Sequence, residues 1–161
     1  MNTLQLIAAS ALLAGASTVF SHESPAHHET SARPAVQQPW GIAGAAQDAQ
    51  RTLVLQMTDD MRFTPAHFTV RQGETVRLRV PNRGQLMHEV VLGTPASLDE
   101  HAAMMRKHPG MEHDAPHMAH VAPGAQGELV WRFNRAGSFD FACLVAGHFQ
   151  AGMRGTFTVT P

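Results

Sequence analysis

Apolar and polar residues alternate with a period of two through much of the chain beyond residue 50. In one such stretch Val76, Leu78 and Val80 are separated by arginines, and later stretches repeat the pattern. This alternation places one face of a strand on a core and the other in water, as in antiparallel sandwiches. Turn signals rich in glycine separate the stretches. We therefore expect strands near residues 51–57, 67–71, 74–81, 87–92, 127–134, 138–143 and 153–160.

About seven short strands of this kind predict an all-β fold, a Greek-key sandwich or barrel. One interruption breaks the β pattern, at Ser97-Leu98-Asp99-Glu100. These four residues have the form of a capping box, with Ser97 as the N-cap and Glu100 at N3, and helix formers follow until Pro109-Gly110. The sequence thus predicts one short helix of about ten residues, inserted between strands.

The N-terminal 50 residues have a different composition. An apolar, alanine-rich segment over residues 4–20 is followed by small and polar residues, which is typical of a secretory signal peptide over residues 1–21. An uncleaved anchor is the alternative, but the segment falls short of the roughly 20 apolar residues that span a bilayer. We expect an exported, periplasmic protein with no stable membrane span after signal removal.

Residues 22–50 are rich in alanine, proline, serine and glutamine, a composition that predicts a flexible tail. His22, His27 and His28 could bind metal weakly, although a solvated low-complexity segment is the commoner explanation. Trp40 is the exception, and it indicates where the tail docks on the domain formed by residues 51–161.

The length and charge of the chain narrow the choice of function. With 161 residues it is long enough for one domain with a substantial core. Its formal net charge is −1 and its basic residues are dispersed, so nucleic acid is not expected as a partner. A single cysteine in an exported protein is open to oxidation and mispairing unless it is sequestered, and metal ligation would sequester it.

That cysteine, Cys143, opens a run in which His148 and Met153 follow, each directly after a glycine. Upstream, His88 begins an apolar, β-branched run. Two imidazoles and a thiolate with a weak axial thioether form the pattern of electron-transfer copper. The alternative is a buried free cysteine, a surface histidine and a core methionine that are close in sequence by chance. The ordered set of four favours copper.

The stretch from about residue 51 to 161 resembles a cupredoxin, and most closely the periplasmic copper-resistance cupredoxins of the CopI type. The residues that carry the resemblance are Asp59-Asp60-Met61-Arg62-Phe63-Thr64-Pro65, Gly73-Glu74-Thr75-Val76, Met87-His88-Glu89 and Phe139-Asp140-Phe141-Ala142-Cys143. The resemblance implies one type 1 copper, blue or green, and a role in copper tolerance. It also implies that His148 is the solvent-edge ligand through which electrons pass to a periplasmic redox partner docked nearby.

A second group of soft donors lies in residues 101–120, which we call the His/Met segment. On a helix its first four members would share one face, at i, i+3, i+4 and i+7. Core packing, solvation and an auxiliary copper site are three competing interpretations, because methionine at helical spacing is often core while thioethers also bind Cu(I). The residues of this candidate auxiliary site are His101, Met104, Met105, His108, Met111, His113, His117, Met118 and His120.

Enzyme functions find little support in the sequence. Ala142 and Leu144 flank Cys143, so the cysteine-to-histidine relay of multicopper oxidases is missing, and no second cysteine could bridge a dinuclear centre. A nucleophilic Cys143 with His148 as base stays open, but it leaves Met153 and His88 unexplained. Two roles remain: a copper-binding protein that sequesters or oxidises Cu(I), or a one-electron carrier between periplasmic partners.

Overall fold

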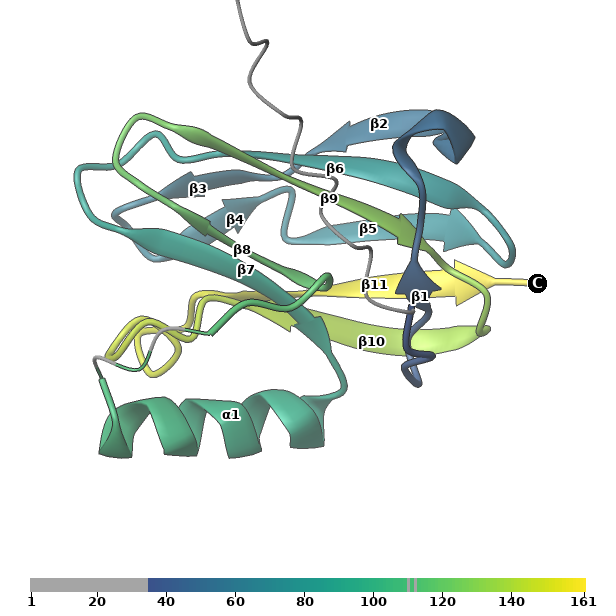
Figure 1. The fold of residues 1–161 in the computed structure, drawn as a ribbon. Coiled ribbons are helices and arrows are strands. Elements are labelled where there is room, and N and C mark those ends of the chain that lie inside the picture. The colour runs from purple at the N-terminus through teal and green to yellow at the C-terminus, as the bar shows by residue number, and fades with distance from the viewer. Residues whose placement is uncertain (1–34, 110, 112) are drawn as a thin grey trace, which may run out of the picture. The chain divides into compact units, whose positions relative to one another are not determined.

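The computed structural model describes residues 35–109, 111 and 113–161, in which strands predominate (Figure 1). One sheet has the order β1-β9-β6-β2, and a second has the order β5-β11-β10-β7-β8. Strands β3 and β4 form a separate antiparallel pair. The strands are β1 (Ile42–Ala43), β2 (Arg51–Val54), β3 (Gln56–Thr58), β4 (Arg62–Thr64), β5 (His67–Arg71), β6 (Thr75–Pro81), β7 (His88–Gly93), β8 (Met118–Val121), β9 (Gln126–Arg132), β10 (Gly137–Ala142) and β11 (Arg154–Thr160).

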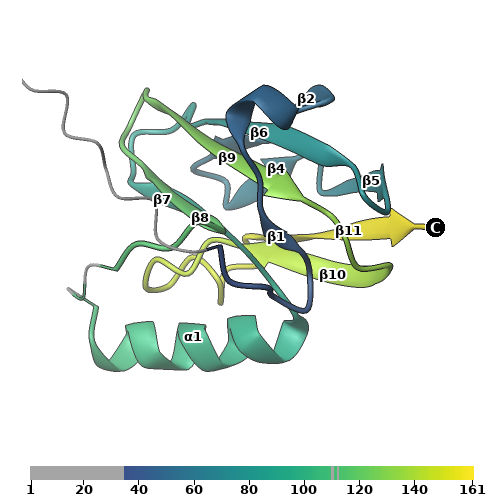
Figure 2. The ribbon, with the colours of Figure 1, turned by 45° about the vertical axis from the view of Figure 1, so that its right-hand side comes forward.

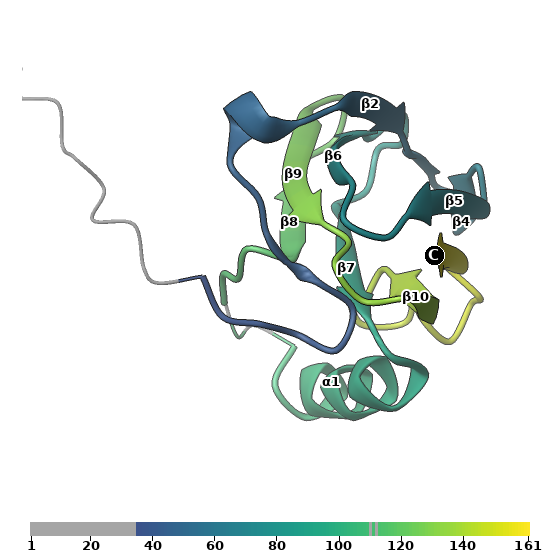
Figure 3. The same ribbon diagram turned by 90° about the vertical axis from the view of Figure 1, so that its right-hand side faces the viewer.

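The all-β prediction is confirmed, and the period-two pattern accounts for it. Val76, Leu78 and Val80 are fully buried, while Arg77 and Arg79 between them are not. These apolar residues belong to one cluster that the two sheets enclose (Figure 3). The pairing is not wholly antiparallel, because β2 pairs with β6 and β5 pairs with β11 in parallel. Alternation along a strand does not depend on the direction of its neighbour, so the sequence could not show this.

Three short elements were absent from the predicted strands: β1, β4 and β8. They have two to four residues, too few for a period to be recognised. In addition, the stretch predicted as one strand over 51–57 is divided into β2 and β3 at Leu55.

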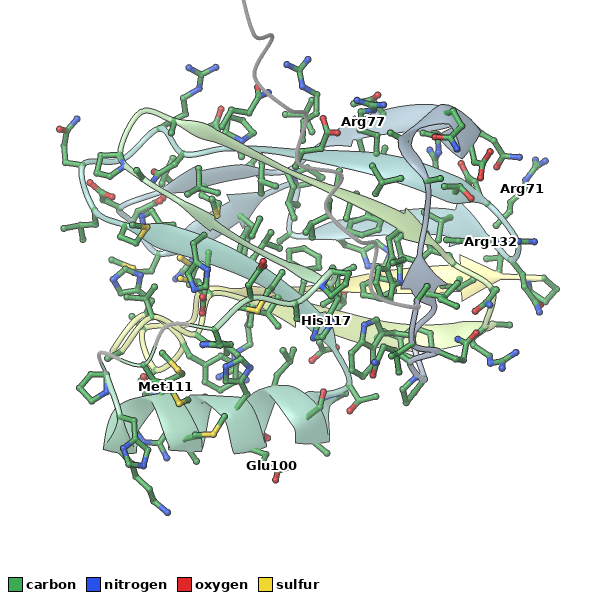
Figure 4. The ribbon with its side chains drawn as sticks, in the orientation of Figure 1. Arg71, Arg77, Glu100, Met111, His117 and Arg132 are labelled. Atoms are coloured by element: carbon green, nitrogen blue, oxygen red, sulfur yellow. The ribbon has the colours of Figure 1, made fainter. Side chains whose placement is uncertain are left out.

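The one α-helix among the described residues, α1 (Pro95–Lys107), lies across the five-stranded sheet next to β7 and β10 (Figures 1 and 2). The predicted capping residues were wrong. Thr94 is the N-cap, and its hydroxyl accepts from the Ser97 N–H at 3.1 Å while the Ser97 hydroxyl accepts from the Thr94 N–H at 2.9 Å. Pro95 needs no N–H partner in the first turn, so the helix begins earlier than expected. Glu100 instead points away from the sheets (Figure 4).

The helix and the chain that follows it bury the outer face of β7, and for this reason all six residues of β7 are buried. Val90 and Leu92 belong to the main core, whereas Val91 belongs to a second cluster. That second cluster includes Leu98 and Met105 of α1. Because β7 is buried on both faces, its side chains can take part in buried polar contacts on either side of the sheet.

Residues 35–50 belong to the segment assigned by composition to a flexible tail, and they contact the rest of the described chain. Trp40 is buried in the main core, and the Trp131 indole N–H donates to its carbonyl oxygen at 3.1 Å. Strand β1 then pairs with β9, and a 3-10 turn follows at Ala46–Asp48. Burial of one large aromatic side chain offsets the conformational entropy that is lost when these residues become ordered, and composition alone does not reveal this contribution. The predicted signal peptide, His22, His27 and His28 lie outside the described residues.

No helix among residues 35–109, 111 and 113–161 is both long and apolar enough to cross a membrane.

We predict that Trp40→Ala lowers the free energy of unfolding by about 3–5 kcal/mol, because it leaves a cavity in the core. Denaturant unfolding would measure the change. Val36→Ala is the control: Val36 is 67% exposed in the same segment and should change stability by less than about 0.5 kcal/mol. Equal effects of the two substitutions would show that residue 40 does not pack as described.

Candidate metal centre

Pairing of β7 with β10 brings the two halves of the candidate site together. The strands run antiparallel, with Ala142 opposite Val91, so the residue after β10 lies beside the start of β7. Cys143 directly follows β10, and His88 is the first residue of β7. The ligand loop, residues 143–153, then turns back into β11 at the end of the molecule away from the C-terminus (Figure 1).

Backbone hydrogen bonds close the ligand loop on itself. The Cys143 N–H donates to the Met153 carbonyl at 3.0 Å, and the Met153 N–H donates to the His148 carbonyl at 3.1 Å. Gly147 and Gly152 precede the histidine and the methionine with φ of 91° and 93°, a region that residues with a Cβ avoid. The loop therefore holds its three candidate ligands by its backbone.

The structure brings His88, Cys143 and His148 together. Nδ1 of His148 lies 3.4 Å from Sγ of Cys143, and Nδ1 of His88 lies 4.0 Å from it. The three ligand atoms lie within 4.8 Å of one another. Met153 is fully buried in the same cluster as Cys143, although its role as an axial ligand remains a prediction.

These separations suit a metal held by two imidazoles and a thiolate. Bonds of about 2.0 Å to nitrogen and 2.3 Å to sulfur, in a trigonal arrangement, would place the sulfur about 3.7 Å from each nitrogen. The sulfur–nitrogen distances of 3.4 and 4.0 Å lie on either side of this value. A thiolate with two imidazoles is the equatorial donor set of type 1 copper.

Burial and hydrogen bonding set the protonation states of the site. Burial raises the pKa of the Cys143 thiol to about 12, so metal binding must displace a proton from sulfur. The Glu89 N–H donates to this sulfur at 3.4 Å and favours the thiolate once it forms. Burial, and then the neighbouring His88, lowers the pKa of His148, which keeps its ring neutral for ligation. A nucleophilic cysteine is favoured by a lowered pKa, whereas burial raises the pKa of Cys143.

Asp59 contacts the ring nitrogen of His88 that faces away from Cys143. The sequence analysis did not predict a role for this residue. Its carboxylate lies 2.9 Å from Nε2 of His88 and accepts the Gln85 N–H at 2.6 Å. The Gln85 N–H, and next the His88 ring, lowers the pKa of Asp59, so the carboxylate is charged. A charged acceptor at Nε2 fixes the tautomer that presents Nδ1 to a metal. Only its position in the quoted Asp59–Pro65 motif could have drawn attention to it.

Glu89 was also missed, and it connects the site to the His/Met segment. Its side chain is 1% exposed, and burial raises its pKa. One carboxylate oxygen accepts the Leu144 N–H at 2.7 Å, and the other lies 2.8 Å from Nε2 of His120. An acidic residue within an apolar strand could have indicated a functional role from sequence, because such groups are seldom fully buried without a partner.

The structure divides the His/Met segment among four environments, and the first is a chain of rings. His101, His113 and His120 form a chain of rings, with centroids 4.5 Å apart for the first pair and 5.7 Å for the second. Burial, followed by the neighbouring His113, lowers the pKa of His101.

The other members of the segment lie apart from that chain of rings. His117 instead packs against Trp40 and Trp131. Met105 and Met118 are buried in the second cluster, with Met111 packed against it, while Met104 is 42% exposed. His108 caps the C-terminal end of α1 at the surface.

Comparison with known proteins agrees with this fold and donor set. The family model of copper binding proteins, plastocyanin/azurin family, matches residues 50–160. The chain belongs to this family of cupredoxins, and copper is its cofactor.

Within the family the chain is similar to curated proteins named Copper-resistant cuproprotein CopI. The relative from Rubrivivax gelatinosus is 55% identical over 121 residues, covering 75% of this chain and 73% of the relative. The relative from Pseudomonas aeruginosa is 35% identical over 159 residues, covering 81% and 87%. The resemblance to CopI-type cupredoxins seen in the motifs is thereby confirmed.

Solved structures support the fold. Auracyanin B has a TM-score of 0.63 at 21% identity, covering 75% of this chain and 96% of that protein. Reduced auracyanin from Roseiflexus castenholzii has a TM-score of 0.58 at 22% identity, covering 70% and 99%.

We predict that Asp59→Asn weakens Cu(II) binding by roughly 10–100-fold, the usual effect of losing a partner behind a ligating histidine. The reduction potential should rise, because the lost negative charge stabilises Cu(II) more than Cu(I). Competition titration and voltammetry would measure both. Asp60→Asn is the matched control, since Asp60 contacts the Thr58 hydroxyl instead of His88. If both variants behaved like the native protein, Asp59 would not orient the ligand.

Proposed function

We propose that this protein is an exported, periplasmic copper-tolerance protein that binds copper in one type 1 centre and handles Cu(I). The observation that carries the proposal is the convergence of the two Nδ1 atoms of His88 and His148 on the buried sulfur of Cys143. The names of the relatives, which describe copper-resistant cuproproteins, support the role in tolerance.

Each residue of the centre has a distinct role in this proposal. Cys143 would hold copper through its thiolate and His88 and His148 through their imidazoles, while the Met153 thioether would be a weak further donor that tunes the potential. The β7–β10 pairing and the closed ligand loop hold these groups in place, so a change of copper oxidation state requires little rearrangement. Small rearrangement permits fast exchange of one electron.

The His/Met segment supports copper handling beyond the type 1 centre. Thioether sulfur prefers Cu(I) and imidazole accepts Cu(II), so a segment that holds both could collect copper and sequester or oxidise it. The histidine rings at positions 101, 113 and 120 lie next to one another and provide the donors for such a role.

A one-electron carrier is the second candidate function, and a surface feature favours it. His148 is half-buried at the end of the molecule, and Leu86 and Met87 beside His88 are 46% and 45% exposed. Exposed apolar side chains next to a ligand with an accessible edge would suit a transient redox partner.

We predict that the copper-loaded protein absorbs strongly in the visible range through thiolate-to-copper charge transfer, and that Cys143→Ser abolishes this absorption. Met153→Leu is the contrasting variant: it should stay coloured with a raised reduction potential, because a weak donor is removed. A colourless loaded protein, or undiminished colour in the serine variant, would refute the type 1 assignment.

A second test separates copper handling from electron carriage. Replacing Met104, Met105, Met111 and Met118 with leucine conserves volume approximately and should preserve fold and colour. If the segment handles copper, the variant binds less copper per chain and protects cells that lack the native protein less well. Copper content and growth in copper would measure this. Unchanged copper content and protection would favour the electron-carrier function.

A further inference from the structure

The Arg62 side chain reaches from strand β4 to the ligand loop. Its Nη1 donates to the Ala151 carbonyl at 3.3 Å and to the Met61 carbonyl at 2.8 Å. A Cβ atom added at Gly152 would lie 3.4 Å from the same nitrogen, so the guanidinium lies directly against the turn that precedes Met153. Arg62 therefore joins the ligand loop to a strand that is distant in sequence.

Arg154, the first residue of β11, contacts the other end of the same turn. Its guanidinium carbon lies 4.2 Å from the centroid of the Phe149 ring, within the range of a cation–π contact. Nη2 of Arg154 lies 3.5 Å from the Phe149 carbonyl. The ring itself is 8% exposed and packs in the second cluster with residues of α1. Because Phe149 directly follows His148, these contacts hold the chain next to a candidate ligand.

The backbone of the turn does not supply partners for all of its carbonyl groups. The Ala151 N–H donates to the Gly147 carbonyl, and the Gly152 N–H donates to the Phe149 carbonyl, both at 3.0 Å. Among the described residues no backbone N–H donates to the Ala151 carbonyl. Basic side chains often bond such carbonyls at the end of a helical turn, where partial negative charge accumulates. Arg62 has this position at the end of the turn.

The hairpin formed by β3 and β4 contacts both parts of the chain that supply candidate ligands. Arg62 reaches the ligand loop, which contains His148 and Met153. Asp59, in the turn of the same hairpin, lies 2.9 Å from Nε2 of His88. One short hairpin therefore connects the histidine of β7 with the ligands that follow β10.

The same hairpin is anchored in the core, so it can resist movement of the loop. Met57 and Phe63 are buried, and the Phe63 ring packs edge-on against Phe141 of β10 with centroids 5.0 Å apart. Met61 has a φ of 59°, in the left-handed region that residues with a side chain seldom adopt. Such backbone conformations persist where the surrounding structure maintains them, and they are frequent at functional sites.

We propose that Arg62 and Arg154 are positioning residues that fix the separation between His148 and Met153. Copper binds a thioether only weakly, so the fold, more than the metal bond, sets how near the Met153 sulfur lies to the other donors. By holding the turn at both ends, the two arginines set the strength of that weak contact and thereby tune the absorption and the reduction potential. The proposal rests on the type 1 centre proposed above and names residues that adjust it.

The first measurement uses the full chain without copper. Amide hydrogen exchange at Gly152 and Met153, whose N–H groups are hydrogen-bonded within the loop, reports how often the turn opens. Arg62→Gln removes a charged contact at the surface and should speed this exchange by about 2–5-fold. Arg154→Gln removes a cation–π contact of similar strength and should do the same. Arg62→Lys keeps a charged donor and should recover most of the native protection.

Arg83→Gln is the matched control for the loss of charge. Arg83 is exposed in the loop before His88, and it donates to the Met57 carbonyl through its backbone N–H, which the substitution retains. Exchange at Gly152 and Met153 should therefore equal that of the native protein. The denaturant midpoint of each variant should stay at the native value, which separates loosening of the turn from loss of the fold.

The second measurement uses the copper-loaded protein. Thiolate-to-copper absorption should persist in Arg62→Gln with altered relative band intensities. The reduction potential should fall in Arg62→Gln and not in Arg62→Lys, because a positive charge beside the ligand loop disfavours Cu(II). Native exchange and a native band pattern in both arginine-to-glutamine variants of the turn, or equal changes in Arg83→Gln, would overturn the proposal. Since exchange is measured without copper, that result is distinguishable from a colourless loaded protein, which would refute the type 1 centre itself.

Discussion

The copper centre depends on the pairing of β7 with β10. These strands are far apart in sequence, and their antiparallel register places His88 beside Cys143. The same pairing positions the Glu89 N–H against the cysteine sulfur and the Leu144 N–H against the Glu89 carboxylate. The ligand loop supplies three candidate ligands from consecutive sequence, but the fourth comes only through this contact between strands. A register shift of one residue would turn His88 away from the cysteine.

Much of the fold and the site could be predicted from the sequence. Alternation identified the long strands because their inward residues bury a shared core, and the order of Cys143, His148 and Met153 marked a metal loop. The same reasoning failed for residues whose role depends on a contact with a residue far away in the sequence. Asp59 and Glu89 are ordinary acidic residues until the fold places them against His88 and Cys143. The helix start was wrong because Thr94 and Ser97 compete as caps and local sequence does not rank them.

The His/Met segment shows a different limit of sequence reasoning. The sequence alone does not distinguish one histidine or methionine of this segment from another. Helical spacing was therefore used to group the first four of them on one face. In the structure the helix ends at Lys107, and the chain then turns to form β8. The donors therefore separate into core residues, surface residues and those that line a pocket beside the ligand loop. Composition indicates that such a segment can bind metal, but tertiary packing decides which of its members are able to do so.

Alternate residues of β7 face different clusters, and this has an evolutionary consequence. His88, Val90 and Leu92 are on the side of the main core, whereas Glu89 and Val91 are on the side covered by α1. Substitutions on the outer side leave the inward residues in register. Selection can therefore act on the size and polarity of the outer surface of this strand separately from the metal-binding face.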